Sequence, residues 1–149
     1  MGAPIPDMQP ADDVAAEVLL DSFKHIAAAE RRRHATVLNY WLSIRGKREF
    51  APIRDLDPLE ISDAGPWSVL LEMIGGGEDA EIRHLGQAIK GGSNVARIGE
   101  SPSGSLLACI AGKLPIVAAT RQAFSFEDEV AGEDGATRCW VTLLPFSSS

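Results

Sequence analysis

The stretch Tyr40-Trp41-Leu42-Ser43-Ile44-Arg45-Gly46-Lys47 marks the end of a helix. Leu38, Trp41 and Ile44 bring an apolar side chain to every third position, a spacing that gives a helix one apolar face. Gly46 follows directly, and glycine is the residue that most often ends a helix. The sequence therefore predicts an amphipathic helix that stops at residue 46.

The region before this stretch continues the helical pattern. Residues 1–10 hold three prolines and no periodicity, so they are expected to form a flexible leader. Asp12 or Asp13 can then cap a helix. Its apolar face comprises Val14, Val18, Leu19, Phe23 and Ile26. Residues 11–45 thus form an N-terminal helical region, and one long helix or two helices with a break both fit the pattern.

An acidic turn follows the helix. Asp55-Leu56-Asp57-Pro58-Leu59-Glu60-Ile61 and the nearby Asp63 gather four carboxylates, which raises the question of a metal site. An Asp-Pro pair at a helix start is what capping and the helix dipole favour. The carboxylates are therefore predicted to begin a second short helix rather than to hold a metal.

Two hairpins are predicted beyond Pro66. In Trp67–Ile74 one set of alternating residues is wholly apolar, Gly75-Gly76-Gly77 suits a turn, and Ala80–Gly86 supplies the returning strand. The ranges 114–127 and 137–146 are read as a second, longer hairpin, because Val, Ile, Thr, Phe and Trp are enriched there.

A short helix is expected between the hairpins. It spans Leu106–Ala111, is capped by Ser103 or Ser105, and ends at Gly112. The order of helix, hairpin, irregular helical segment and hairpin predicts an α+β fold in which helices pack on an antiparallel sheet. Trp67 and Trp140 are both expected to be core residues on strands.

Composition narrows the class of protein. The net charge of −7 repels nucleic acid and anionic membranes, so neither is an expected partner. The sequence lacks a bilayer-length apolar run and a secretion signal, which favours a soluble, cytoplasmic protein. Cys109 and Cys139 lie far apart in the sequence without a Cys/His cluster, so two buried free thiols are expected rather than a zinc site or a disulfide.

The helix end at Tyr40–Lys47, the acidic turn at Asp55–Ile61 and the run Trp67–Ile74 together resemble the opening of a bacterial PAS-like sensory domain, found mostly in alphaproteobacteria. The resemblance continues at Arg83-His84-Leu85-Gly86-Gln87-Ala88-Ile89 and at Gly112-Lys113-Leu114-Pro115-Ile116-Val117. It implies that residues 46–149 form a PAS-like domain whose irregular segment crosses one face of the sheet, while the N-terminal helix covers the other. Such a sheet has five strands and only four can be read, so the central last strand is missing from this pattern.

The sequence offers no convergent set of catalytic groups, and we expect no enzymatic activity, no metal and no cofactor. His25, His34 and His84 are scattered. The first two are expected on the helical region as solvated or partly packed side chains. His84 lies on a predicted strand, where it could ligate haem, but nothing else in the sequence supports a haem site.

The function expected from the resemblance is that of a non-enzymatic sensory module with a small apolar ligand. It would act through protein–protein contacts, as a homodimer or with a partner signalling protein, by way of the N-terminal helix. The alternative is a ligand-free structural or partner-binding adaptor, and plain core is the other reading of the pocket residues. The predicted pocket is lined by Trp67, Val69, Leu71, Met73, His84, Leu106, Cys109, Ile110, Phe124 and Trp140.

Overall fold

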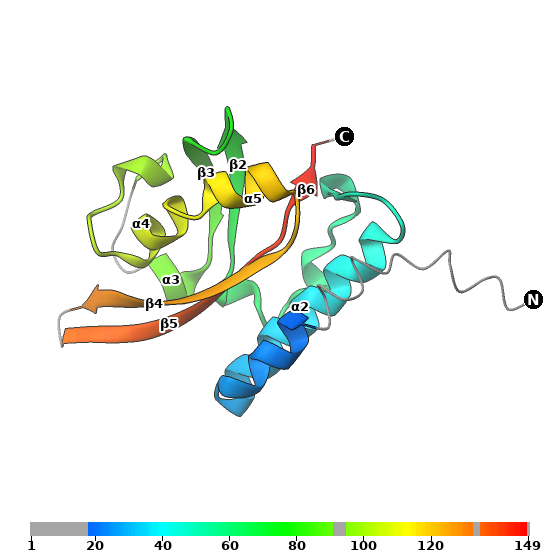
Figure 1. Ribbon diagram of the computed structural model, residues 1–149, viewed down its shortest axis with the longest axis horizontal. Helices are drawn as coiled ribbons and strands as arrows, with labels where there is room; N and C mark the ends of the chain where they lie inside the picture. The colour runs from blue at the N-terminus through cyan, green and yellow to red at the C-terminus, as the bar shows by residue number, and fades with distance from the viewer. Residues whose placement is uncertain (1–17, 91–94, 133–134, 149) are drawn as a thin grey trace, which may run out of the picture. The chain divides into compact units, whose positions relative to one another are not determined.

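The computed structural model describes residues 18–90, 95–132 and 135–148, and the chain is α+β there, with small two-stranded sheets (Figure 1). It divides into two compact units. The first runs up to Leu56 and takes back Phe146–Ser149, and the second is Asp57–Pro145. Val14, Asp12, Asp13 and the leader lie outside the described residues.

The N-terminal helical region contains a break. Residues 18–22 are helical, a 3-10 turn follows at Phe23–His25 (η2), and helix α2 spans Ala28–Arg45. Between them Ile26 and Ala27 have extended ψ angles of 148° and 145°. Of the two predicted readings, the one with a break is therefore correct.

The first unit buries apolar residues from both sides of this break. Phe23, Ile26, Leu38 and Trp41 are all buried. Val18 is 62% exposed, so the predicted stripe is buried only in part. The predicted stop is confirmed: helix α2 ends at Gly46, whose φ of 60° lies in the left-handed region that glycine adopts easily.

The first unit is closed by residues from the end of the chain. Strand β1 (Ala51–Pro52) pairs in parallel with strand β6 (Phe146–Ser147), with Ala51 opposite Phe146. The 3-10 turn η3 (Ile53–Asp55) follows β1. Residue 146 was expected to end the strand of the second hairpin, but β6 instead belongs to this separate pair.

The second unit begins with two 3-10 turns and the first hairpin. The predicted cap is confirmed, because the Asp57 side chain accepts a hydrogen bond from Leu59 N (3.0 Å) at the start of η4 (Pro58–Ile61). Turn η5 (Gly65–Trp67) then leads to strands β2 (Val69–Ile74) and β3 (Asp79–Leu85). Trp67 thus precedes the strand on which it was predicted.

A bulge adjusts the faces of this hairpin. Leu70 pairs with His84 and Leu71 with Ile82, so Arg83 is an extra residue on β3. Ile82 and Leu85 would point to opposite faces of a regular strand. Because of the bulge, both pack against the same apolar core.

The second hairpin is longer. Strand β4 (Phe124–Gly132) pairs with β5 (Gly135–Leu143) in unbroken antiparallel register from Phe124–Leu143 to Gly132–Gly135. A hairpin was predicted here, but its first strand begins ten residues later than the sequence indicated.

Those ten residues are mostly helical. Residues Leu114–Thr120 form α5, so the prediction of a strand from residue 114 is wrong. Pro115 fits the first turn of a helix, where its missing N–H has no intrahelical acceptor. Leu114 and Val117, three positions apart, are buried, and Arg121 ends the helix with a φ of 60°.

The segment between the hairpins is otherwise built from short helices: α3 (Gln87–Lys90), η6 (Ile98–Glu100) and α4 (Leu106–Ala111). Helix α4 and its end at Gly112 confirm the prediction, and Ser105 rather than Ser103 is the cap. The described strands form three separate pairs, so they do not build the single sheet that was expected.

Candidate functional site

The predicted pocket coincides in part with the apolar core of the second unit. Ile110 belongs to this core, and Val69, Leu71, Leu106, Cys109 and Phe124 pack against it. They come from β2, α4 and β4, elements that are far apart in the sequence. The structure therefore brings six of the predicted residues into one cluster.

The remaining four predicted residues lie elsewhere. Trp67 is 54% exposed in η5, so its prediction as a core residue on a strand is wrong. Met73, at the far end of β2, is also exposed. His84 is exposed opposite Leu70, on the face of the hairpin away from the core.

Trp140 lies on β5 as predicted, but not in the core. It alternates with Val141, which packs against the apolar core, so its indole points to the opposite face of the hairpin. It is half-buried there, and its Nε1 makes no hydrogen bond within the described residues. Trp140 is therefore separated from the other pocket residues by the hairpin itself.

The set of predicted pocket residues does not include five other buried members of the core, which are Ala80, Ile98, Leu107, Leu114 and Phe126. Ile98 is 1% exposed although it comes from a segment rich in Gly and Ser. The available signal there was Ile98 with Val95 three positions earlier, a pair too short to establish a periodicity.

A carboxylate holds Ile98 in place. Asp79 Oδ1 accepts hydrogen bonds from Gly99 N (2.9 Å) and from Ala80 N (2.8 Å). These two bonds lower the pKa of Asp79, because they favour its ionised form. Glu100 closes the same turn by accepting from Arg97 N (3.0 Å). Ser101, the next residue, has a buried hydroxyl without a hydrogen bond in the described part of the chain.

Cys109 is the polar group of the cluster. Its thiol lies 3.9 Å from the carbonyl oxygen of Glu129 on β4. Burial, and then the charge and hydrogen bond of Asp128, raise the pKa of this thiol, while Lys113 acts in the opposite direction. Since the thiolate is the reactive form, Cys109 is poorly suited to act as a nucleophile. Cys109 and Cys139 are half-buried rather than fully buried as predicted, and they form no disulfide.

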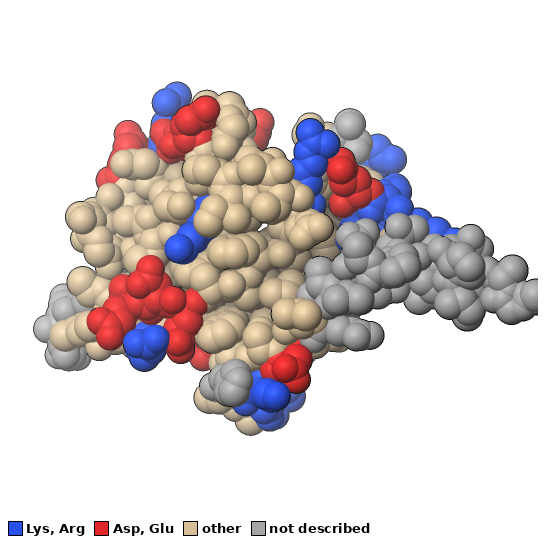
Figure 2. All heavy atoms as spheres, viewed as in Figure 1, with Lys and Arg blue, Asp and Glu red and all other residues tan. Residues whose placement is uncertain are grey.

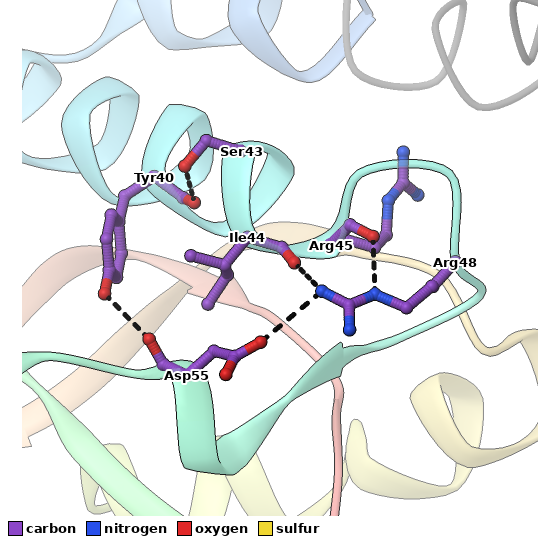
Figure 3. Close-up of polar contacts among 6 residues, drawn as sticks. All are labelled: Tyr40, Ser43, Ile44, Arg45, Arg48 and Asp55. Carbon is purple, nitrogen blue, oxygen red and sulfur yellow. Dashed lines mark hydrogen bonds and ion pairs between the residues drawn. The ribbon is translucent and has the colours of Figure 1, made fainter.

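A polar cluster surrounds the end of α2 in the first unit (Figure 3). Arg48 donates to the carbonyl oxygens of Ile44 and Arg45, the latter from Nε at 3.1 Å, and its Nη2 lies 3.5 Å from Asp55 Oδ2. The Tyr40 hydroxyl donates to the backbone oxygen of Asp55 at 3.3 Å. These bonds satisfy helix-end carbonyls and attach the turn η3 to α2.

The same helix end buries a charged residue. Arg45 is buried, and its guanidinium carbon lies 4.9 Å from the centre of the Trp41 ring, a cation–π contact. The stretch that marks the helix end in the sequence thus has a structural role in the first unit. It supplies no pair of nucleophile and base.

The outer part of the second hairpin is acidic. Figure 2 shows acidic side chains gathered there around a single basic group. Glu127, Asp128 and Glu129 follow one another on β4, and Arg138 of β5 lies 2.8 Å from Glu127 and 3.5 Å from Glu129. These exposed ion pairs form a solvated surface, and each contributes little to stability.

The described residues contain neither a candidate metal cluster nor a candidate membrane-spanning helix. In residues 18–90, 95–132 and 135–148, no three His, Cys, Asp or Glu side chains are grouped in a way that could hold a metal ion. Within the same ranges, no helix combines the length and apolar character needed to cross a bilayer.

Comparisons with protein-family models, curated proteins and solved structures gave no significant match to the chain.

Proposed function

We propose that this protein is a non-enzymatic, PAS-like sensory module that binds a small apolar ligand in the core of its second unit and signals through protein–protein contacts. The observation that carries the proposal is the position of α4. Its residues Leu106, Leu107 and Ile110 meet side chains from both hairpins in one apolar cluster. A ligand among these side chains would contact the helices and both hairpins at once. A shift of α4 would therefore change the packing of each hairpin.

The chemistry of the cluster favours an apolar or amphipathic ligand. Its members are almost all hydrocarbon side chains, and burial of a ligand there contributes roughly 25 cal/mol for each Å² removed from water. Cys109 is a polar group of the cluster that is available to orient it. A ligand changes the state of such a module only if it binds two arrangements of the unit with different affinities.

The test is a thermal-shift titration of the full chain with decanoic acid and with 1-anilinonaphthalene-8-sulfonate. We expect a saturable rise in melting temperature, since a ligand that binds only the folded state stabilises it. Ile110→Trp should abolish the rise, because the larger ring fills the cluster. Ile116→Trp is the matched control, because Ile116 lies exposed on α5. No rise with either probe would contradict ligand binding, provided that circular dichroism shows each protein to be folded.

A ligand-free adaptor is the second candidate. It is favoured by two large apolar side chains on the 3-10 turns before β2: Leu59 is 81% exposed and Trp67 is 54% exposed. Aromatic residues of this kind are frequent anchors of protein interfaces. An adaptor would show no thermal shift, and Trp67→Ser would leave its melting temperature unchanged while weakening its association with the partner.

A further inference from the structure

Strand β2 has the composition of an inner strand, but it occupies the edge of a sheet. It reads Val69-Leu70-Leu71-Glu72-Met73-Ile74 and is apolar except for Glu72. Near-continuous apolar runs are typical of strands enclosed by their neighbours, whereas open edges normally carry charges or proline. Strand β2 nevertheless pairs only with β3 in the part of the chain that the structure describes.

Two other strands of this unit make a backbone hydrogen bond from their outer edge to another segment. The N–H of Ile82 on β3 donates to the carbonyl of Ala96 (2.9 Å), and the N–H of Ala131 on β4 donates to the carbonyl of Gly104 (2.9 Å). Within residues 18–90, 95–132 and 135–148, the outer edge of β2 makes no backbone hydrogen bond to another segment. In the described part of the chain the outer edge of β2 is therefore open, as is that of β5, whereas β3 and β4 are each bonded to another segment at one point.

The register identifies the backbone groups on this open edge. Ile82 directs its N–H away from β2, so Leu71 and Ile82 are a non-hydrogen-bonded pair of the antiparallel ladder. The N–H and C=O of Leu71 consequently point to the outer edge, as do those of Met73 two residues later. The extra residue of the bulge, Arg83, is on β3, so the outer edge of β2 stays regular.

We propose that β2 pairs antiparallel with β2 of a second copy of this chain and joins two hairpins into one four-stranded sheet. The edge is complementary to itself. In a register centred on Leu71, Met73 lies opposite Val69 of the second copy and Glu72 lies opposite its Leu70, so no two carboxylates face each other. Glu72 is already bonded to Arg83 Nε at 2.7 Å, which neutralises its charge beside the apolar neighbour. A two-fold interface of this kind uses the same patch on both copies.

The inference is independent of the proposed ligand and is tested by Met73→Pro in the full chain. Proline removes the outward N–H of Met73 and breaks no bond to β3, because edge strands accept proline where the N–H faces solvent. Met73→Ala is the matched control, since it removes the same exposed side chain and keeps the N–H. Native mass spectrometry and light scattering over a concentration series measure the dissociation constant. We expect dimers for the wild type and Met73→Ala, and a dissociation constant raised by more than about tenfold for Met73→Pro.

Hydrogen exchange of the wild-type protein provides a second test, which does not require the Met73→Pro variant to fold. The amides of Leu71 and Met73 should exchange more slowly as the protein concentration rises. A wild-type monomer at all concentrations would overturn the proposal, as would a dimer unaffected by Met73→Pro. Protection of both amides in a monomer would also overturn it, because another part of the same chain would then occupy the edge.

Discussion

Gly77 shows how one residue fixes the first hairpin. Its φ is 92°, and a Cβ built on it would lie 2.9 Å from the backbone carbonyl carbon of Leu114. A side chain at this position would therefore be unfavourable for two reasons: the positive φ would strain its backbone, and its Cβ would lie too close to the first residue of α5. The turn of the hairpin and the start of the helix can lie this close only because residue 77 has no side chain.

We predict that Gly77→Ala lowers the free energy of unfolding by about 2–3 kcal/mol. Gly76→Ala is the control, because its nearest neighbour would be a carboxylate oxygen of Glu78 at 3.7 Å, an ordinary contact. Its effect should stay below about 1 kcal/mol. Urea denaturation of both variants measures the difference, and equal midpoints would show that the approach to Leu114 is not constrained.

His34 should make the stability of the protein depend on pH. Its imidazole packs against Phe23 at 5.5 Å between ring centres and lies 3.5 Å from Glu30. Burial lowers the pKa of His34 from its ordinary value of 6.5, an effect that Glu30 opposes and that Arg33 reinforces. A lowered pKa means that the unfolded chain binds the proton more readily. The stabilisation is therefore present above about pH 6.5 and is lost as the pH falls through the folded pKa.

Replacing His34 with Gln should flatten the pH dependence of unfolding between about pH 7 and 5. His84→Gln is the matched control, since His84 is exposed on β3. The measurement is the urea midpoint at a series of pH values for all three proteins. If His34→Gln retains the wild-type slope, another group is responsible for it.

At the scale of the single element, helix α4 is stabilised by its N-terminal cap. The Ser105 side chain accepts a hydrogen bond from Ala108 N at 3.2 Å, which satisfies one of the amide groups without an intrahelical acceptor. We predict that Ser105→Ala costs about 1 kcal/mol of stability. Ser103→Ala, a change at the exposed alternative cap, should cost much less, and chemical denaturation of the two variants distinguishes them. Equal losses would contradict the assignment of the cap.

Some elements are predictable from sequence because their cause is local. The β2–β3 hairpin follows from alternating residues around a glycine turn, and α4 follows from its cap and its final glycine. Helix α5 was mistaken for a strand, because in only two turns Leu114, Ile116 and Ala118 fit strand alternation as well as Leu114 and Val117 fit a helix. Packing against the core decides between these readings, and the local sequence does not contain that information.

In the candidate site too, the residues set by local sequence could be predicted and those set by distant contacts could not. Val69 and Leu71 could be predicted from strand alternation, because both face the core from one strand. Ile98 could not, because it is held by the bond from Gly99 to Asp79, twenty residues earlier in the chain. Trp67 was misassigned because Gly65 and Pro66 begin a 3-10 turn that ends at the tryptophan, before the strand starts.

At the scale of the whole molecule, the second unit has a core of its own. Every residue of its apolar cluster lies between Asp57 and Pro145. We therefore predict that a fragment of residues 57–145 folds alone and melts cooperatively. Circular dichroism and calorimetry measure this, and a fragment without a cooperative transition would contradict it.

Two substitutions sharpen this test. Ile110→Ala should cost about 2–5 kcal/mol in the fragment and should lower the melting temperature of the same transition in the full chain. Trp41→Ala removes a buried ring from the first unit and should leave the transition of the second unit in place.

The pairing of β1 with β6 has a consequence for synthesis on the ribosome. Residues 51–52 can form their strand pair only after residues 146–147 have been synthesised. The first unit therefore cannot complete its folding until the whole second unit has left the ribosome. At about 5–20 residues per second, this delay is on the order of ten seconds, far longer than a small helical unit needs to collapse. During that interval Ala51 and Pro52, both buried in the finished protein, lack their strand partner. The nascent N-terminal region is thus the part of the chain for which a chaperone would have the most time to bind.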